Sequence, residues 1–443
     1  MDLNLLHDLV RSALAGGADA AEAVGAERSA LSVGVRLGKL EEVEREESRD
    51  LGLRVFVGKR QAVVSGSDLS PSARAKLVER AVAMARLAPE DPYAGFAPGD
   101  RLAKGPFLDL ELYDPTELSP ERLEAMATEA EDVARAAPGV TNSEGGSASL
   151  SASAWSYVTS HGFEGDHRGS AFSLSASVIA GEGSGMERGG EGRTTRYAAD
   201  LPGAQGIGAE AGRRAVSRVG ARKLESRTAA VMFENRIATS LIGPLLGAIS
   251  GPAVARGVSF LKDKLGEQVF ASGIRIHEAP HRVRGLGSGP FDDEGVATVE
   301  RDLIQDGLLT TWLMNSAAAR QLGMEVTGHA SRSLAGPPGV SSHNLTVAAG
   351  RETPEAMMKA AGSGLLVTSM FGPSLNANNG DWSAGVSGFW FENGEPAYPV
   401  NEITVAGNLI DIYRRLVPAS DLEIRGSANS PSLFVDAMAI AGR

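Results

Sequence analysis

Two hydrophobic periods alternate along this chain, and they limit the folds that it can adopt. Apolar residues between 6 and 14 recur at helical spacing, and Gly16-Gly17 ends that run. At 31–37 and again at 51–57 the period changes to two, as in antiparallel strands with one face in water. Because both patterns return further along the chain, the sequence predicts an α+β protein with antiparallel sheets.

The length of the chain requires more than one domain. At 443 residues, of which 42% are hydrophobic, it exceeds the size at which a single core stops growing. The stretch 88–115 is rich in proline, and a new apolar strand begins near residue 228. We therefore expect two α/β modules, at 1–110 and 111–226, before a larger β-rich C-terminal domain at 227–443.

Serine-rich segments fall in the middle of the chain. Residues 147–159 and 170–180 alternate with period two, which predicts strands despite their serine content. Residues 181–195 combine glycine with charge, so we expect a loop there.

The first part of the C-terminal domain mixes one apolar helix with short strands. Residues 237–250 are apolar on nearly all sides and predict a buried helix, which Pro244 would kink or divide. Short strands are then predicted at 268–270, 273–276, 295–301 and 308–313, and a helix at 316–322.

The charge balance and the lack of cysteine exclude several classes of function. The net charge of −12 argues against a nucleic-acid partner. A basic run with helical spacing is interpreted as a solvated helix face; it consists of Arg213, Arg214, Arg218, Arg222 and Lys223. Without cysteine, disulfides, zinc-thiolate sites and thiol nucleophiles are excluded. We find no signal peptide and no apolar stretch of about 18 residues. The expected location is cytoplasmic, with no membrane partner.

One segment matches the zinc-binding pattern H-E-x-x-H. His277, Glu278 and His281 would bind zinc if a helix placed both histidines on one face. Pro280 opposes a helix, and the preceding residues alternate as in a strand. Glu300 stands at a distance that suits a third ligand, as one of many acidic residues would by chance. We interpret the segment as a strand followed by an exposed polar turn.

Other motifs are weaker. His329 and His343 bracket a loop rich in glycine and proline and could share a metal, although such histidines are more often plain polar loop residues. There is no G-x-S-x-G elbow and no Walker A sequence. The run Gly206-x-Gly208-x-x-Ala211 fits a dinucleotide fingerprint only loosely, because no apolar strand precedes it.

The segment 371–390 surrounds aromatic residues with glycine and small polar side chains. Such a segment is either a tight β-turn or a loop that faces a ligand. Glycine permits close approach of another backbone, so we predict a peptide contact here, with Asn379, Asp381 and Ser383 as the candidate residues.

Five blocks of the chain resemble the TldE/PmbA group of the TldD/PmbA metallopeptidases, and they follow the family's order over nearly the whole length. The blocks are Leu51–Ser70, Ser259–Val269, Gly285–Gly295, Leu308–Gly323 and Asn378–Leu409. The resemblance implies a heterodimer in which the TldD-like subunit carries a zinc-binding H-E-x-x-x-H helix and hydrolyses peptides. It also implies capture of unfolded peptides by strand addition in an enclosed cavity. The family is linked to peptide maturation, antitoxin degradation and modulation of DNA gyrase.

The resemblance can be tested on one segment. The metal helix of the TldD-like subunit would correspond to the residues that follow the apolar strand at 229–233. Residues 237–261 contain no His, Asp, Glu or Cys, whereas a catalytic zinc ion needs three protein ligands. We therefore expect no catalytic residue and no metal in this chain, zinc in the TldD-like partner, and a homodimer when the chain is alone.

We interpret the chain as the companion subunit that helps to form the peptide chamber. Two alternatives stay open. One is a self-sufficient zinc metallopeptidase that uses His277, Glu278 and His281. The other is a regulatory binding protein that acts, for instance on gyrase, without proteolysis.

Overall fold

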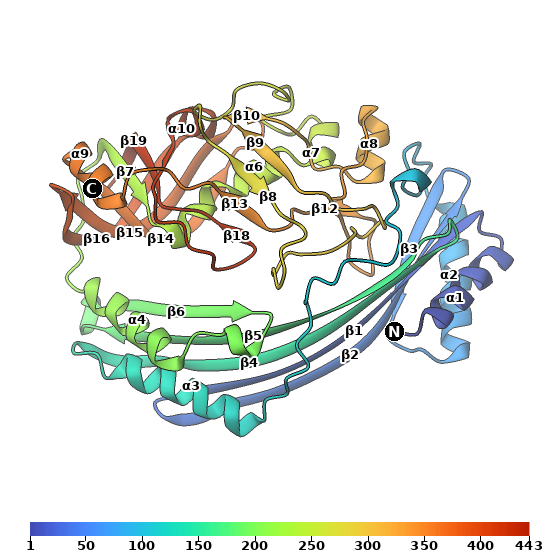
Figure 1. Ribbon diagram of the computed structural model, residues 1–443, viewed down its shortest axis with the longest axis horizontal. Helices are drawn as coiled ribbons and strands as arrows, with labels where there is room; N and C mark the ends of the chain where they lie inside the picture. Colours follow the sequence, from blue (N-terminus) through green and yellow to red (C-terminus); the bar gives the residue numbers. More distant parts are fainter. Residues whose placement is uncertain (443) are drawn as a thin grey trace.

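A curved antiparallel sheet of six strands lies beneath the C-terminal domain in the computed structural model, which describes residues 1–442 (Figure 1). The strands follow the order β3-β2-β1-β4-β5-β6. Their bounds are Ala20–Arg36 (β1), Lys39–Val57 (β2), Arg60–Gly66 (β3), Val140–Thr159 (β4), Glu164–Ala180 (β5) and Glu187–Thr195 (β6). Because β1 pairs with β4, the strands of the first and second expected modules form one sheet.

Four helices cover one face of this sheet. They are α1 (Leu3–Ala15), α2 (Pro71–Leu87), α3 (Pro120–Arg135) and α4 (Ala204–Ser217). Along β1, Ala21 and Ala23 pack in the cluster with α1 and α2, and Val33 and Val35 pack with α3 and α4. These odd-numbered residues share one face because neighbours in a strand point to opposite sides. The even-numbered residues of β1 therefore look toward the C-terminal domain.

The C-terminal domain is built on a second six-stranded sheet, of order β16-β15-β14-β7-β19-β17. β16 also pairs with β19, so the sheet curls back on itself. The strands are Arg227–Phe233 (β7), Ser363–Leu375 (β14), Asp381–Glu392 (β15), Glu395–Asn408 (β16), Val417–Pro418 (β17) and Leu433–Ala441 (β19). Helices α8 (Ser316–Leu322), α9 (Pro354–Ala361) and α10 (Leu409–Arg415) belong to the same domain. The α+β class with a β-rich C-terminal region is thus confirmed.

A smaller five-stranded sheet, of order β10-β9-β8-β13-β18, completes the domain. Its strands are Ile276–Glu278 (β8), Arg301–Gln305 (β9), Leu308–Leu309 (β10), Leu345–Val347 (β13) and Ala428–Asn429 (β18), and a separate ribbon joins Ala330–Ser331 (β11) to Gly339–Val340 (β12).

Several strands predicted in this region are wrong or too long. Gln268 makes only an isolated bridge with Leu308, and residues 295–300 lie outside any strand. Backbone N–H groups there bond to a side chain and not to another strand. The Asp292 carboxylate accepts from the N–H groups of Glu294 and Val296, each at 2.9 Å. Such local bonds compete with the pairing of strands.

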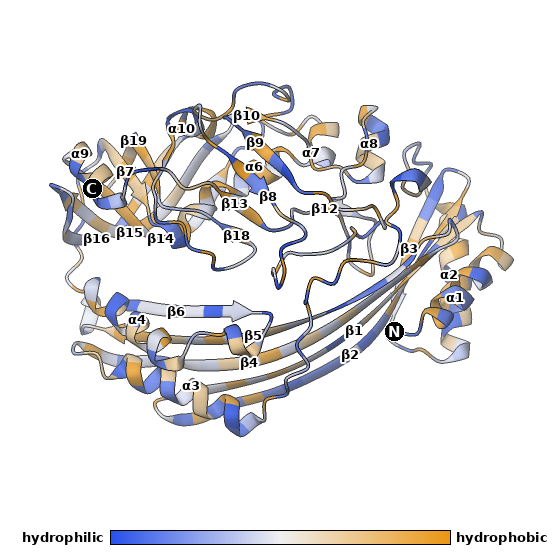
Figure 2. Ribbon diagram, viewed as in Figure 1, coloured by the Kyte–Doolittle hydropathy of each residue, from blue (hydrophilic) through white to orange (hydrophobic). Residues whose placement is uncertain are grey.

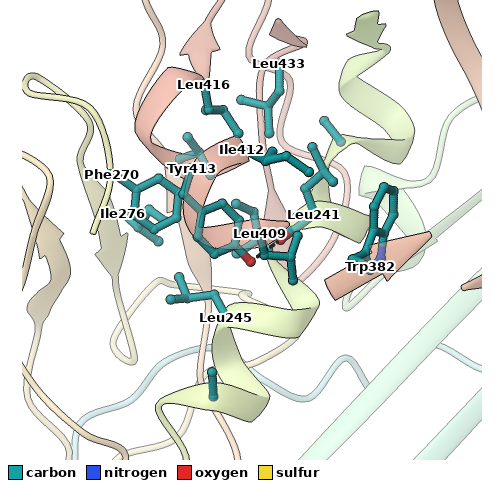
Figure 3. Packing of buried hydrophobic residues seen from close by; sticks show 14 of the residues in the cluster. Leu241, Leu245, Phe270, Ile276, Trp382, Leu409, Ile412, Tyr413, Leu416 and Leu433 are labelled. Carbon is teal, nitrogen blue, oxygen red and sulfur yellow. Dashed lines mark hydrogen bonds between the residues drawn. The ribbon is translucent and has the colours of Figure 1, made fainter. Parts of the chain in front are cut away.

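The apolar segment after β7 is divided, as Pro244 predicted. It forms α5 (Asn235–Ala238), a 3₁₀ turn (Thr239–Leu241), α6 (Gly243–Ala248) and α7 (Gly251–Ala255). Figure 3 shows Leu241 and Leu245 against the aromatic pair of Phe270 and Tyr413, whose ring centroids are 4.3 Å apart. The Tyr413 hydroxyl donates to the Leu241 carbonyl at 2.8 Å. The segment therefore serves as packing for the core.

The two halves of the molecule join through a buried ionic group, which we call the clasp. It comprises Glu22, Arg54, Tyr157 and Arg332. The Glu22 carboxylate accepts from Arg54 Nη1 at 3.2 Å and from the Tyr157 hydroxyl at 2.6 Å, and it pairs with Arg332 of the C-terminal domain. The Glu22 and Arg332 side chains are both 0% exposed.

Across the described residues, no helix is both long and apolar enough to span a bilayer.

Candidate functional site

A cavity of about 960 Å³ separates the concave face of the N-terminal sheet from the C-terminal domain, at the end of the sheet near β6. Strand residues form its floor, among them Gly34, Ser147, Ser175 and Gly192. Arg236, Leu286 and residues 425–427 of the C-terminal domain form the opposite wall. Figure 1 shows β6 running below this domain. The cavity therefore lies between the halves of the protein, where ligand sites are common.

The polar floor follows from the alternation in the serine-rich segments, whose predicted strands are confirmed. Ser147 pairs with Ser175, and Ser175 pairs with Gly192, so all three face the cavity side. Their neighbours Ala148 and Leu174 point the other way, into the core beneath α3 and α4. The serines thus leave a smooth polar surface while the strands stay anchored by their apolar face.

The loop expected at 181–195 is wrong for residues 187–195, which form β6. Close packing explains the glycine at position 189 of β6, because a Cβ there would lie 2.1 Å from the backbone nitrogen of Ala215 in α4. Figure 2 shows β6 in pale to hydrophilic colours. β6 is the last strand of its sheet in the described part of the chain. One edge of its backbone is therefore not paired with a further strand, although Arg218 Nη1 and Arg214 Nη1 donate to the carbonyls of Arg188 and Gly190 at 3.0 and 3.1 Å.

Ion pairs connect β6 with the C-terminal domain across the cavity. The Glu191 carboxylate contacts Arg193 Nη1 at 3.0 Å and Arg425 Nη1 at 3.2 Å, and it also pairs with Arg214. Arg193 and Arg425 both pair with Glu423 as well. The interpretation of the basic run as a solvated face is wrong for Arg214, whose side chain is only 9% exposed.

The segment after β7 brings one charged residue to the cavity, Arg236 at its wall. Arg236 Nη2 donates to the Thr368 carbonyl at 2.6 Å. The following residues, 237–261, offer no carboxylate, imidazole or thiolate. Leu241, Leu245 and Ile249 are buried there. Zinc needs such ligands, so this segment does not fit the metal that the family resemblance implies.

The H-E-x-x-H string does not assemble as a zinc motif. Its first part is strand β8, in which neighbouring side chains point to opposite faces. His277 Nδ1 contacts Asp302 Oδ1 at 2.8 Å, and His281 Nε2 contacts Thr298 Oγ1 at 3.0 Å. The strand expected at 273–276 lies instead at Ile276–Glu278, and Glu278 is 0% exposed and not part of an exposed turn.

Glu278 instead meets His329 and His343, which sequence reasoning had paired without it. His329 Nε2 lies 2.7 Å from Glu278 Oε2, and His343 Nδ1 lies 3.3 Å from Glu278 Oε1. Within residues 1–442 this is the one group of three His, Cys, Asp or Glu side chains whose ligand atoms lie within 4.8 Å of one another. A signal was available: Ile274, Ile276 and Glu278 alternate on one buried face, and a buried acid needs partners.

The environment sets the protonation of this group. Burial acts to raise the pKa of Glu278, but hydrogen bonds from His329 and His343 outweigh it and hold that pKa well below its usual range. Burial also lowers the pKa of His329, although its contact with Glu278 opposes this. The carboxylate is therefore ionised at neutral pH and accepts hydrogen bonds from its neighbours.

The three predicted peptide residues lie elsewhere. Asn379 belongs to the turn between β14 and β15, and Asp381 and Ser383 begin β15. Asn379 Nδ2 donates to Asp381 Oδ2 at 2.8 Å, and Asn408 Nδ2 donates to Asp381 Oδ1 at 3.0 Å. These bonds build a tight turn, and the residues are not among those that line the large cavity. Their contact with peptide remains a prediction.

Comparison with known families accounts for most of the chain. Models described as the PmbA/TldA metallopeptidase domain 1, central domain and C-terminal domain match residues 21–85, 113–219 and 226–442. The chain is 40% identical to Metalloprotease PmbA of Escherichia coli O157:H7, over 99% of this chain and 96% of that relative.

Solved structures share the fold. A candidate modulator of DNA gyrase from Bacteroides thetaiotaomicron superposes with a TM-score of 0.92 at 26% identity, and the match covers 100% of this chain and 99% of the other. TldE from Thermococcus kodakarensis superposes with a TM-score of 0.87 at 21% identity, covering 99% of this chain and 100% of that one.

Proposed function

Because the chain belongs to the PmbA/TldD metallopeptidase family, we propose that it is the companion subunit of a two-chain peptidase. It holds an unfolded peptide while a TldD-like subunit cleaves it. The observation that carries the proposal is the segment after β7. Residues 237–261 have no side chain that can bind zinc, and their leucines and isoleucines pack in the core. The adjoining cavity is nevertheless large and polar.

The cavity suits an extended peptide better than a compact ligand. Beyond the two carbonyls that Arg214 and Arg218 contact, the edge of β6 that pairs with no further strand offers backbone N–H and C=O groups, which pair with any extended chain whatever its side chains. Serine and glycine on the floor leave room for those side chains. Arginine and glutamate line the wall together, so the cavity is not selective for a single charge.

The division of labour follows from these properties. In the partner, a bound zinc ion would activate water and polarise the scissile carbonyl. This chain positions the peptide, excludes competing folded proteins by the size of the chamber, and contributes no group to the bond-breaking step. Alone, it forms a homodimer.

The test compares the purified chain, a TldD-like partner and the two together. We expect peptidase activity on an unfolded peptide only when the partner is present, and light scattering should give a dimer for the chain alone. His277→Ala should leave the activity of the pair unchanged. Zinc-dependent peptidase activity of the chain alone, lost in His277→Ala, would instead support the self-sufficient enzyme.

The structural neighbour described as a candidate gyrase modulator favours a second candidate function, regulation without proteolysis. The two functions differ in one readout. If this chain acts on gyrase in cells that lack the TldD-like subunit, the companion role is overturned. If the effect needs a partner with an intact metal site, the companion role stands.

A further inference from the structure

The Glu278, His329 and His343 group lies at the base of an arm, residues 330–342, that reaches from the C-terminal domain to the N-terminal sheet. Strands β11 and β12 form its ribbon. His329 directly precedes the arm and His343 directly follows it, so a single carboxylate, that of Glu278, contacts both of its ends. The His343 backbone N–H also donates to Glu278 Oε1 at 2.8 Å.

The arm makes the contact that joins the two halves. Its Arg332 enters the clasp and pairs with Glu22. Its Leu334 backbone lies against β2, where a Cβ at Gly52 would stand 2.7 Å from the Leu334 carbonyl oxygen. Whatever holds the base of the arm therefore also holds Arg332 in position.

The three side chains at the base are a ligand set for a transition metal. Two imidazole nitrogens and one carboxylate oxygen lie within 4.8 Å of one another. Zinc sites use these ligand types, and a water molecule would complete four-coordination. Glu278 is 0% exposed and His329 is 1% exposed, whereas the His343 side chain is 14% exposed and gives an ion a route in.

A neighbouring hydroxyl supports this ligand set. Thr327 Oγ1 lies 2.7 Å from His329 Nδ1, on the side of the ring away from Glu278. Metal-bound histidines usually donate their second N–H to such an oxygen, which fixes the tautomer. Thr327 Oγ1 also lies 3.4 Å from the Met314 carbonyl, so its own proton has an acceptor when it accepts from His329.

We propose that Glu278, His329 and His343 bind one divalent cation of the zinc class, which fastens the arm and thereby the two halves of the protein. The ion would hold the arm in place, because its three ligands lie at the base of the arm and are not among the residues that line the peptide cavity. Sequence reasoning expected no metal in this chain, because residues 237–261 lack ligands and because Glu278 was grouped with His277 and His281 and not with His329 and His343. Zinc binding at the arm does not depend on the companion role of the chain.

The first experiment uses the full unmodified chain. After removal of metal with a chelator, zinc chloride is added in competition with a chromophoric chelator, and cobalt chloride is added for absorption spectra. We expect one zinc ion per chain, a tetrahedral cobalt spectrum and a rise in Tm on adding zinc. Absence of stoichiometric zinc binding, or zinc binding without a rise in Tm, overturns the proposal.

Variants then locate the ion. His343→Gln, at the most exposed ligand, should abolish stoichiometric binding, and Thr327→Val should weaken zinc affinity by about 10- to 100-fold. The matched control is His277→Gln with His281→Gln, which changes two nearby histidines and should bind zinc as the unmodified chain does. If the control loses zinc and His343→Gln keeps it, the site is elsewhere and the proposal fails.

A peptidase assay separates this proposal from the proposed function. The His343→Gln variant should have a lower Tm than the unmodified chain. In the peptidase assay, cleavage with this variant should still require the TldD-like partner. Zinc bound by an inactive lone chain supports both proposals. Peptidase activity of the lone chain overturns only the companion role.

Discussion

The concave face of the N-terminal sheet meets the C-terminal domain in two places of opposite character. At one end Glu22 on β1 enters the clasp, where Glu22 and Arg332 are wholly buried. Toward the other end of the same strand, Gly34 lines a polar cavity of about 960 Å³. The arginines there are more exposed, with Arg193 at 17% and Arg425 at 23%, although the Glu191 carboxylate that they share is 5% exposed.

The difference separates support from binding along a single strand. A buried charge is costly unless paired, so the clasp fixes the distance between the two halves. Ion pairs whose arginines stay partly in water contribute less to stability and leave groups available to a ligand. Substitutions at the two ends should therefore have opposite effects, strong on stability at the clasp and strong on peptide binding at the cavity.

The largest effect is expected at the clasp. Arg332→Met leaves Glu22 buried with one guanidinium fewer, and breaking such a pair costs about 3–5 kcal/mol of folding stability. Denaturant unfolding measures the loss. Arg193→Met in the cavity is the matched control and should cost far less. Equal losses in the two variants would remove the distinction between the ends.

The next effect tests the close contact beside the clasp. Gly52→Ala would place a methyl group 2.7 Å from the Leu334 carbonyl oxygen. Overpacking of this kind costs about 1–3 kcal/mol, which a fall in Tm would report. Gly206→Ala, in helix α4 with open space around it, should be neutral or stabilising. A neutral Gly52→Ala would show that the arm does not press on β2.

Acid should weaken the clasp. Burial acts to raise the pKa of Glu22, but Arg332, Arg54 and the Tyr157 hydroxyl outweigh it and hold that pKa below the usual 4.5. The folded state thus favours the carboxylate. Its stabilisation is present above the ordinary pKa and is lost as the pH falls through the lowered value.

Glu22→Gln removes this titration. Unfolding free energies measured from pH 6 down to about pH 3 should fall more steeply in the unmodified chain than in Glu22→Gln. The comparison uses the slope with pH, because the variant is also less stable at neutral pH. Parallel slopes would mean that Glu22 titrates alike in the folded and unfolded states.

The smallest effect on stability is expected in the cavity. Arg425→Gln leaves Glu191 paired with Arg193 and Arg214, so the unfolding free energy should change by less than about 1 kcal/mol. With the TldD-like partner present, KM for an unfolded peptide should rise several-fold while kcat stays the same, as expected when binding alone is lost. Arg45→Gln on the exposed β1–β2 hairpin serves as the control. A fall in kcat alone would contradict a holding role.

The local structure was largely readable from the sequence, because it follows from period and capping. The serine-rich strands, the helix at Ser316–Leu322 and the division near Pro244 all appear as predicted. β6 was not predicted, because its glycines were interpreted as a sign of a loop. Gly189 instead allows close packing against Ala215 of α4, a contact that the local sequence does not show.

Contacts between residues far apart in the chain could not be predicted from the sequence. His329 and His343 stood out as a pair, but their meeting with Glu278 depends on how β8 and the arm fold together. The clasp joins residues from both halves for the same reason, and no local pattern marks Glu22 or Arg332 as partners.

The pairing of β1 with β4 has a consequence for how the protein is made. Val24 pairs with Tyr157, so β1 cannot pair with β4 until more than a hundred further residues have been synthesised. Until then it is an unprotected edge, which invites aggregation. The charged stretch of β2 from Glu41 to Glu47 accompanies it in the nascent hairpin and opposes association with other chains.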